Sequence, residues 1–370
     1  MKTRLLAVTT LAVLALTACG EAPDESADAG TAAGSAAAAD FMACMVTDSG
    51  GIDDRSFNAS AWAGLNSVKD AMGIEAKYVQ SKADADYTPN VNSLVAEDCG
   101  IIVTVGFKLG DATRTASQAN PEEKFAIVDE NPDGDEETKD VLEPIDNVKP
   151  LLFNTAEAAY LGGYLAAGMT QTGTVGTFGG AKLPSVTIFM DGFVDGVAKY
   201  NEDNASDVEV LGWDKEKQDG LFVGKFDAPT DGKNQATNMI QQGADIILPV
   251  AGGSGLGAAA AAQESGGEVA IIWVDTDGYA SAPQYKEVFL TTVEKDVAGA
   301  VALATTDTVN GAYSNTAYVG TLANEGVGLA PYHDYESKVP AELTTKIEEL
   351  KAQIIDGTIK VESVSSPRVS

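Results

Sequence analysis

The fold is decided near the N-terminus by a stretch that reads FMACMVTDSGGIDDRSFN, residues 41–58. Residues 41–46 are apolar and favour a buried β-strand. The glycines at 50 and 51 then let the backbone turn sharply. Ser56 suits the N-cap of a helix, and residues 57–72 carry a helical pattern. The stretch therefore predicts a strand, a tight loop and a helix in succession, the repeating unit of α/β proteins.

The same alternation of strand and helix continues along the chain. The candidate strands are 41–46, 76–80, 101–106, 124–129, 151–153, 175–178, 208–213, 244–250, 269–275, 288–293 and 317–322. The candidate helices are 57–72, 157–169, 186–201, 233–242, 256–264, 295–310 and 340–356. Continuously apolar runs are typical of parallel strands covered on both faces. The pattern predicts an α/β fold with parallel sheets, and there are too many strands for one ordinary sheet, so we expect two similar lobes.

Residues that follow strands are candidates for a binding site, because open α/β sheets bind ligands at the carboxyl ends of their strands. Asp48 follows the first strand, and Phe57 begins the helix after it. Phe226 stands at a later crossover, in the run 223–227. Each aromatic ring either lines a cleft or packs in the core. Phe107, directly after a strand and a glycine, has the same two interpretations.

Two charged residues at strand ends are further candidates. Asp275 ends the strand 269–275, where its carboxylate could accept two charge-assisted hydrogen bonds from the cis-diol of a ribose. The alternative is that Asp275 only caps a turn. Lys295 lies at the next junction of strand and helix. A surface lysine is the alternative for that position.

A glycine-rich turn at 249–258 also has two interpretations. The spacing Gly253-x-Gly255-x-x-Ala258, with Asp275 about 20 residues further on, mimics a dinucleotide-binding fingerprint. Such turns are also common in α/β proteins because bare backbone amides suit any polar ligand group. A dinucleotide-dependent enzyme is thus an alternative, although no acid–base residue is identifiable near the turn.

The N-terminus indicates export. Basic residues precede the apolar run 5–16, which is shorter than the roughly 20 residues that span a bilayer and is typical of a secretory signal. The run ends in LTAC, residues 16–19, which resembles the lipobox of bacterial lipoproteins. We expect residues 1–18 to be a signal peptide and Cys19 to carry lipid that anchors the protein on the extracytoplasmic face of the cell membrane. An ordinary signal peptide with an incidental cysteine is the alternative.

Composition limits the remaining possibilities. Residues 20–40 lack large apolar side chains and predict a flexible linker. The net charge of −31 argues against binding of nucleic acid or of anionic lipid through a basic surface. Cys44 and Cys99 either form a disulfide, which an exported protein permits, or remain buried free thiols. With His333 as the single histidine and no Cys-x-x-Cys pair, we expect no metal site and no cofactor.

Residues 46–58 resemble the signature of the basic membrane protein family of lipoproteins, which includes purine nucleoside receptors of ABC importers. Further matches follow in order at 157–163, 189–193, 224–227, 252–255 and 274–277, and the resemblance covers about 41–365. It implies a type I periplasmic-binding-protein fold, in which two lobes close on a ligand in the cleft between them. The predicted lobes are 41–155 plus 279–322 for the N-terminal lobe, and 156–278 plus 323–365 for the C-terminal lobe.

The resemblance also implies roles for the candidate residues. Phe57 and Phe226 match two aromatics that sandwich a base, and Asp48 matches an acid that faces the ligand. Asp275 matches the acid that holds the ribose, and Lys295 assists it. The predicted ligand-binding set is Asp48, Phe57, Asn58, Phe226, Gly252, Gly253, Asp275 and Lys295. Gly278 stands where many members have glutamine, which leaves the finer ligand preference open.

These observations predict a monomeric receptor without enzymatic activity, with no catalytic residues. It would bind a nucleoside, most readily a purine nucleoside, and dock on the permease of an ABC transporter. The absence of an arginine cluster disfavours a phosphorylated nucleotide. The alternatives are a receptor for a free sugar or a furanone signal and, less favoured, the dinucleotide-dependent enzyme.

Overall fold

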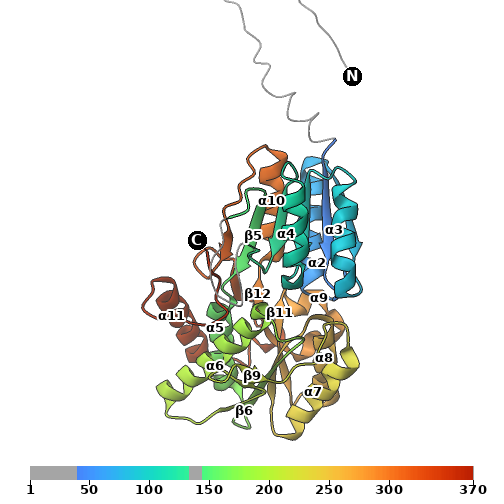
Figure 1. Cartoon of the computed structure of the whole chain (residues 1–370). Helices are drawn as coiled ribbons and strands as arrows, with labels where there is room; N and C mark the ends of the chain where they lie inside the picture. The colour runs from blue at the N-terminus through green and yellow to red at the C-terminus, as the bar shows by residue number, and fades with distance from the viewer. Residues whose placement is uncertain (1–39, 133–143, 370) are drawn as a thin grey trace, which may run out of the picture.

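The protein is built from two α/β lobes, one above the other in Figure 1. The structure, a computed structural model, describes residues 40–132 and 144–369. The first lobe contains a six-stranded sheet of order β13-β5-β4-β3-β1-β2, and the second a six-stranded sheet of order β14-β12-β11-β10-β6-β7. All neighbouring strands are parallel except β14, which runs antiparallel to β12. The predicted fold class, two mainly parallel sheets flanked by helices, is confirmed.

The bounds of the elements follow the predicted alternation closely. The first sheet contains β1 (Met42–Thr47), β2 (Glu75–Gln80), β3 (Ile101–Val105), β4 (Phe125–Val128), β5 (Val148–Phe153) and β13 (Tyr318–Gly320). The second contains β6 (Thr174–Gly179), β7 (Glu209–Leu211), β10 (Ile246–Val250), β11 (Ala270–Asp275), β12 (Phe289–Lys295) and β14 (Val327–Leu329), and a separate hairpin pairs β8 (Trp213–Asp214) with β9 (Asp219–Gly220). The helices are α2 (Phe57–Met72), α3 (Tyr87–Val95), α4 (Gly110–Ala119), α5 (Thr155–Met169), α6 (Pro184–Asn204), α7 (Pro229–Gln241), α8 (Gly255–Glu264), α9 (Gly278–Ser281), α10 (Val297–Val309) and α11 (Ala341–Ile355).

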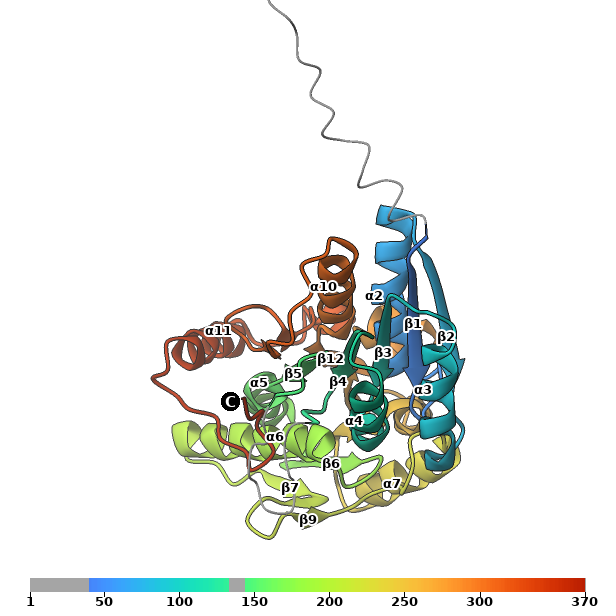
Figure 2. The same ribbon diagram turned by 45° about the horizontal axis from the view of Figure 1, so that its top comes forward.

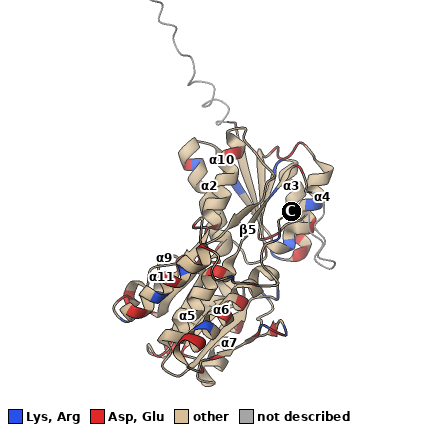
Figure 3. Cartoon of the chain, turned by 90° about the vertical axis from the view of Figure 1, so that its left-hand side faces the viewer, with Lys and Arg blue, Asp and Glu red and all other residues tan. Residues whose placement is uncertain are grey.

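Helices cover both faces of each sheet, which explains the apolar strand sequences. Every residue of β3, β5 and β11 is buried, whereas the edge strand β2 alternates between exposed and half-buried positions. Figure 2 shows α10 beside α2 on the first lobe, although the two helices are far apart in the sequence. Figure 3 shows acidic residues, coloured red on the ribbon, on both lobes, in keeping with the net charge of −31.

Small residues allow α5 and α6 to pack backbone to backbone in the second lobe. A Cβ atom added at Gly163 would lie 2.1 Å from the carbonyl oxygen of Phe193. One added at Gly196 would lie 1.9 Å from the carbonyl oxygen of Tyr160. These distances exclude any side chain there, so the matches at 157–163 and 189–193 mark a helix–helix contact.

The chain crosses between the lobes three times, and one crossing differs from the prediction. It crosses after β5, after β12 and between β13 and β14. The predicted N-terminal segment 279–322 is wrong in its first part, because residues 289–295 form β12, which pairs with β11 and β14 in the second sheet. The connection through α9 and the 3-10 helix at Pro283–Val288 packs on α8 and returns the chain to the same sheet. Only α10 and β13 from this part of the chain belong to the first lobe.

The first lobe contains a disulfide between Cys44 of β1 and Cys99, two residues before the start of β3. Both residues are buried, at 0 % and 2 % exposure, within the apolar layer that α3 and α4 cover. The bond links neighbouring strands and closes a loop with a sequence separation of 55. Of the two possibilities that the sequence left open, the structure has the disulfide.

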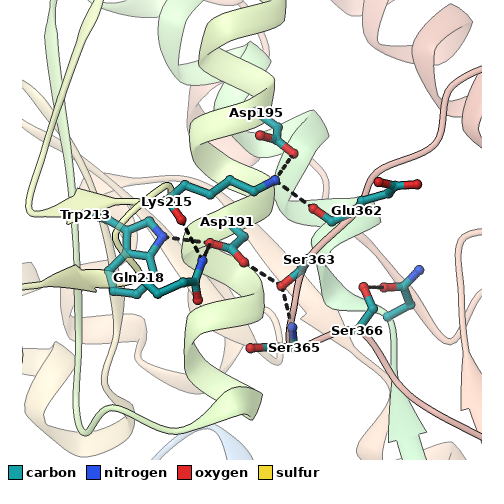
Figure 4. Close-up of polar contacts among 10 residues, drawn as sticks. Asp191, Asp195, Trp213, Lys215, Gln218, Glu362, Ser363, Ser365 and Ser366 are labelled. Atoms are coloured by element: carbon teal, nitrogen blue, oxygen red, sulfur yellow. Dashed lines mark hydrogen bonds and ion pairs between the residues drawn. The ribbon is translucent and has the colours of Figure 1, made fainter. Parts of the chain in front are cut away.

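The C-terminal tail after α11 runs back along α6 and contacts both lobes (Figure 4). Asp191 of α6 is fully buried and accepts hydrogen bonds from the Trp213 indole at 2.8 Å and the Ser363 hydroxyl at 2.6 Å. Further along, Ser366 donates to Asn154, at the first crossing between the lobes. The tail then reaches the first lobe, where Asn131 donates to the carbonyl oxygen of Arg368. The described part of the tail therefore packs against the folded body.

The predicted signal peptide, the lipidated Cys19 and the linker up to residue 39 lie outside the described residues. Among the helices of the part that the structure describes, none has both the length and the apolar character needed to cross a membrane.

Candidate ligand-binding site

A pocket lies between the two lobes and collects almost all of the predicted ligand-binding residues. The first lobe contributes Asp48, Phe57, Asn58, Phe107 and Asp129, and the second contributes Phe189, Phe226, Gly252, Asp275 and Lys295. Gly253, which was also predicted, is buried beside the pocket, where the position of an added Cβ lies 3.0 Å from the carbonyl oxygen of Phe226. Phe107 lines the cleft, which settles the two interpretations that the sequence allowed.

The pocket is where the carboxyl ends of the two sheets face each other. Asp48 follows β1 and Asp129 follows β4 in the first sheet. In the second sheet Gly252 follows β10, Asp275 ends β11 and Lys295 ends β12. Parallel strands place all of these residues at one edge of each sheet. The position at a strand end, which indicated Asp48, Asp275 and Lys295 in the sequence, is thus the reason that these residues meet.

The start of α2 is held by Asp54 rather than by Ser56. The Asp54 carboxylate accepts hydrogen bonds from the backbone N–H groups of Ser56 at 3.0 Å, Asn58 at 2.7 Å and Ala59 at 3.1 Å. The Ser56 side chain makes no cap, and its hydroxyl instead donates to Asp275 of the other lobe. Burial raises the pKa of Asp54 to about 6. The expected serine cap is therefore replaced by an aspartate cap, which frees Ser56 to join the lobes.

We expect Asp54→Ala to lower the free energy of unfolding by about 1–2 kcal/mol, because three N–H groups at the helix start lose their acceptor. The folded-state pKa of Asp54 lies above the ordinary value of 3.8, so protonation favours the folded chain. The contribution of Asp54 is therefore full below about pH 4 and declines as the pH rises through 6. Denaturant unfolding should show a larger loss at about pH 4.5 than at about pH 7.5. Asp53→Ala, at an exposed neighbouring position, is the control, and an equal loss in both variants would contradict the capping role.

The same loop orients Asp48 toward the cleft. Its Oδ1 accepts hydrogen bonds from the Asn58 amide and from the Gly50 backbone N–H, each at 2.8 Å. The Asn58 amide also donates to Asp54 at 3.0 Å, so it ties the cap of α2 to Asp48. Burial raises the pKa of Asp48, although these hydrogen bonds oppose the shift. Asn58 therefore fixes the position of an acid in the pocket wall.

A buried charge cluster occupies the side of the pocket nearest the crossings. The Lys295 ammonium lies 2.7 Å from Asp129 and 3.4 Å from Asp275, and the three side chains are 4 %, 7 % and 9 % exposed. Burial opposes the charge on Lys295, but the two carboxylates hold its pKa above the ordinary value. Burial also raises the pKa of Asp129, against the pull of Lys295. The surface-lysine interpretation of Lys295 is wrong, and the ion pair with Asp129 joins the lobes.

Aromatic rings from both lobes face the same space. Phe57 comes from the first lobe and Phe226 from the second, and both remain half-buried. The Lys295 Nζ lies 4.5 Å from the centroid of the Phe57 ring, within the range of a cation–π contact. Phe226 is held by its backbone, because its carbonyl oxygen accepts from the Ser254 N–H at 2.8 Å. Each lobe thus contributes one phenyl ring to the lining of the pocket.

The glycine-rich turn at 249–258 has a packing role that needs no phosphate. A Cβ atom at Gly257 would lie 1.8 Å from the carbonyl oxygen of Pro229, so the glycine lets α8 approach α7. At Gly255 the corresponding atom would lie 3.0 Å from the Trp273 ring. Of the glycines of this turn, only Gly252 lines the pocket, next to Val250 and Ala251. The fingerprint-like spacing therefore reflects close contacts inside the second lobe.

Several pocket residues were not singled out from the sequence, and Asp129 and Phe189 illustrate why. Asp129 follows β4 and could have been found with the strand-end rule, since the predicted strand 124–129 ended on it. Phe189 lies inside α6, where a buried aromatic gives no signal of a site. Within residues 40–132 and 144–369, no group of histidine, cysteine and acidic side chains could hold a metal ion.

Comparison with known proteins identifies the family. The model of the Bmp family, described as ABC transporter substrate-binding protein PnrA-like, matches residues 41–365. The chain belongs to this family. The resemblance that residues 46–58 carried is thereby confirmed, and the protein is a substrate-binding component of an ABC transporter.

Individual relatives agree with the family assignment. The chain is 34 % identical to a CD4+ T-cell-stimulating antigen of Listeria innocua, over 98 % of this chain and 99 % of the relative. It is 32 % identical to the ABC transporter nucleoside-binding protein BmpA of Lactococcus lactis, over 98 % and 100 %. Among solved structures, a solute-binding protein of Aeropyrum pernix K1 superposes with a TM-score of 0.77 and 26 % identity, over 86 % of this chain and 92 % of that one.

A more distant structural match shows the fold alone. A sugar-binding protein of a sugar ABC transporter from Bacillus halodurans superposes with a TM-score of 0.56 at 14 % identity, over 80 % of this chain and 99 % of that one. The two-lobe fold is therefore shared with receptors for other solutes. The fold alone does not identify the ligand, which depends on the residues of the pocket.

Proposed function

We propose that this protein is a lipid-anchored, extracytoplasmic receptor that binds purine nucleosides for an ABC importer. The observation that carries the proposal is the composition of one pocket. Two phenyl rings from opposite lobes, Phe57 and Phe226, share it with the cluster of Asp129, Asp275 and Lys295. A nucleoside has the matching halves, a flat apolar base and a sugar rich in hydroxyl groups.

The order of the strands separates the two halves of the pocket. Asp129 follows β4, Asp275 ends β11 and Lys295 ends β12, and these strands lie toward the crossings. Asp48 follows β1, further from the crossings. We therefore assign the ribose to the side of Asp275 and the base to the space between the two rings, toward Asp48.

The interactions suit each half. The two oxygens of Asp275 can accept hydrogen bonds from the ribose hydroxyls, and charge-assisted bonds are stronger than neutral ones. Stacking of a base against an aromatic ring adds about 0.5–1.5 kcal/mol beyond the burial of apolar area. The positive charge of the Lys295 ammonium offsets the negative charges of Asp275 and Asp129 when the ligand excludes water from the pocket.

The charges in the pocket favour a neutral ligand over a phosphorylated one. Four carboxylates line the pocket, those of Asp48, Asp54, Asp129 and Asp275, against the two ammonium groups of Lys108 and Lys295. Lys108 is already paired with Asp84 at 2.9 Å. A phosphate group would add negative charge to a site that has no arginine among these residues.

The ligand that the protein retains during purification tests this proposal. Protein purified without added ligand is denatured, and the released small molecules are identified by mass spectrometry. We expect a purine nucleoside in amounts comparable to the protein, and much less from an Asp275→Ala variant prepared in parallel. Recovery of a free sugar or of a dinucleotide in its place would overturn the nucleoside assignment.

The lipid anchor has its own test in the full-length chain. We expect Cys19→Ala to move the protein from the membrane fraction to the soluble fraction, because the two acyl chains that hold it would be lost. Phase separation in detergent followed by immunoblotting measures the partition. Cys99→Ser is the control, since Cys99 lies in the disulfide of the folded body. If the Cys19 variant still partitions with detergent, the anchor assignment is wrong.

A further inference from the structure

Tyr87 has a hydroxyl group that the folded protein leaves without a partner. It is the first residue of α3, and its side chain is 4 % exposed. The ring packs in the apolar layer around Val91, Leu94 and Cys99. The hydroxyl oxygen is fully buried and makes no hydrogen bond of ordinary geometry, and the side chain and backbone of Ser49 are the polar groups beside it. A buried hydroxyl without a well-placed partner destabilises the folded state, so its retention calls for a reason.

The position of Tyr87 supplies that reason. Tyr87 lines the ligand pocket. Its ring belongs to a core cluster of the first lobe, and the hydroxyl is the polar end of the side chain. Asp48 lies close enough to influence its ionisation, and burial raises the pKa of Tyr87 to about 12. The hydroxyl therefore keeps its proton and is available as a donor.

Tyr87 lies at the end of the pocket away from the charge cluster. It begins the helix that follows β2, and β2 is the edge strand of the first sheet, three places from β4 and its Asp129. In the proposed binding mode this end receives the base. Asp48 offers an acceptor there, and Tyr87 offers a donor beside it. A purine carries donor and acceptor atoms side by side along its polar edge.

We propose that the Tyr87 hydroxyl donates a hydrogen bond to an acceptor atom on the polar edge of the bound purine and so helps to select the base. This inference rests on the proposed nucleoside function. The hydroxyl has no partner in the ligand-free protein, and the bound purine would supply one. A site with such a donor discriminates against analogues that lack the acceptor, because the donor would then stay buried and unpaired.

Calorimetric titration of Tyr87→Phe tests the proposal, since the variant keeps the ring and removes only the hydroxyl. We expect affinity for inosine or guanosine to fall about 5- to 30-fold, from the loss of one buried hydrogen bond to the ligand. The unfolding midpoint of the ligand-free variant should stay unchanged or rise. Tyr313→Phe is the matched control, because that hydroxyl already donates to the carbonyl oxygen of Phe125 at 3.0 Å, away from the pocket lining. It should lower stability and leave affinity unchanged.

A set of analogues that each lack one acceptor of the base completes the test. Purine riboside, which lacks the 6-oxygen of inosine, and 7-deazainosine, which lacks the N7 acceptor, are titrated into the parent and Tyr87→Phe. For the analogue that lacks the acceptor of this hydrogen bond, the parent should bind more weakly than it binds inosine. Tyr87→Phe should bind that analogue and inosine with the same affinity. Equal losses in both proteins for every analogue, or an unchanged affinity of Tyr87→Phe for a nucleoside that the parent binds, would overturn the role of Tyr87. Failure of the parent to bind any nucleoside would instead overturn the proposed function.

Discussion

Replacement of Lys295 with methionine is expected to lower the free energy of unfolding by about 3–5 kcal/mol, the range found when one partner of a buried ion pair is removed. The ammonium lies 2.7 Å from Asp129 and 3.4 Å from Asp275, and all three side chains are almost fully buried. Methionine fills a similar volume without the charge, so the two carboxylates would face each other uncompensated. Affinity for the ligand should fall as well, because Asp275 and Asp129 would no longer be held by the same cation.

The pH dependence of the Lys295→Met variant gives the more specific readout. Burial already raises the pKa of Asp129 against the pull of Lys295, and without that pull the pKa rises further. Protonation of Asp129 then favours the folded state, so the stability of the variant is retained at low pH and is lost as the pH rises through the folded-state pKa. Denaturant unfolding at about pH 5 and pH 8 measures this difference.

A surface lysine provides the control for that experiment. Lys77 pairs with Glu97 on the surface, where the side chains are 36 % and 42 % exposed. Lys77→Met should cost no more than about 1 kcal/mol at either pH. Equal unfolding midpoints for Lys295→Met and the parent at both pH values would show that the cluster is not the electrostatic link that the structure indicates.

Replacement of Asp275 with alanine is expected to reduce affinity for nucleosides by about 10- to 100-fold or more, since each unpaired buried polar group of the ligand costs roughly 1–3 kcal/mol. The effect should depend on the sugar. Nucleosides should lose far more than free bases, because the acceptors of Asp275 serve the ribose hydroxyls. Phe57→Ala should weaken both classes of ligand, because stacking on the base is lost from each.

Ser56→Ala separates binding of the ribose from closure of the lobes. The Ser56 hydroxyl donates to Asp275 across the cleft, so alanine at position 275 also removes this contact. If Asp275 acts only by joining the lobes, the two variants should lose the same affinity for nucleosides and for free bases. If it binds the ribose, Asp275→Ala should show the larger loss and the dependence on the sugar. Calorimetry with adenosine, guanosine, inosine and adenine decides between them.

Local patterns in the sequence predicted most of the elements. The bounds of α2, 57–72, agree with the prediction, and each predicted strand coincides with a strand of the structure or overlaps one. The lobe boundary at 279 could not be predicted in the same way. The sequence between 276 and 288 reads as a loop, and nothing local shows that it returns to the second sheet instead of crossing to the first.

The site was predictable in position and less so in its contacts. The strand-end rule found Asp48, Asp275 and Lys295, which all line the pocket. It could not show that Ser56 would bond to Asp275 or that Asp129 would pair with Lys295, since both contacts join the lobes and depend on how these close. Tyr87 gave no signal in the sequence, because the helix that it begins, α3, was not among the predicted helices. Its unpartnered hydroxyl is visible only in three dimensions.

The most direct measurement is calorimetric titration of the ligand-free protein, prepared by unfolding, removal of bound small molecules and refolding. We expect one binding site for inosine, guanosine or adenosine, with a dissociation constant in the range of about 1 μM or below, which corresponds to at least roughly 8 kcal/mol of binding free energy. We expect no measurable binding of free ribose or of a dinucleotide at the same concentrations. Binding of ribose or another free sugar by refolded protein that binds none of the nucleosides would contradict the nucleoside assignment.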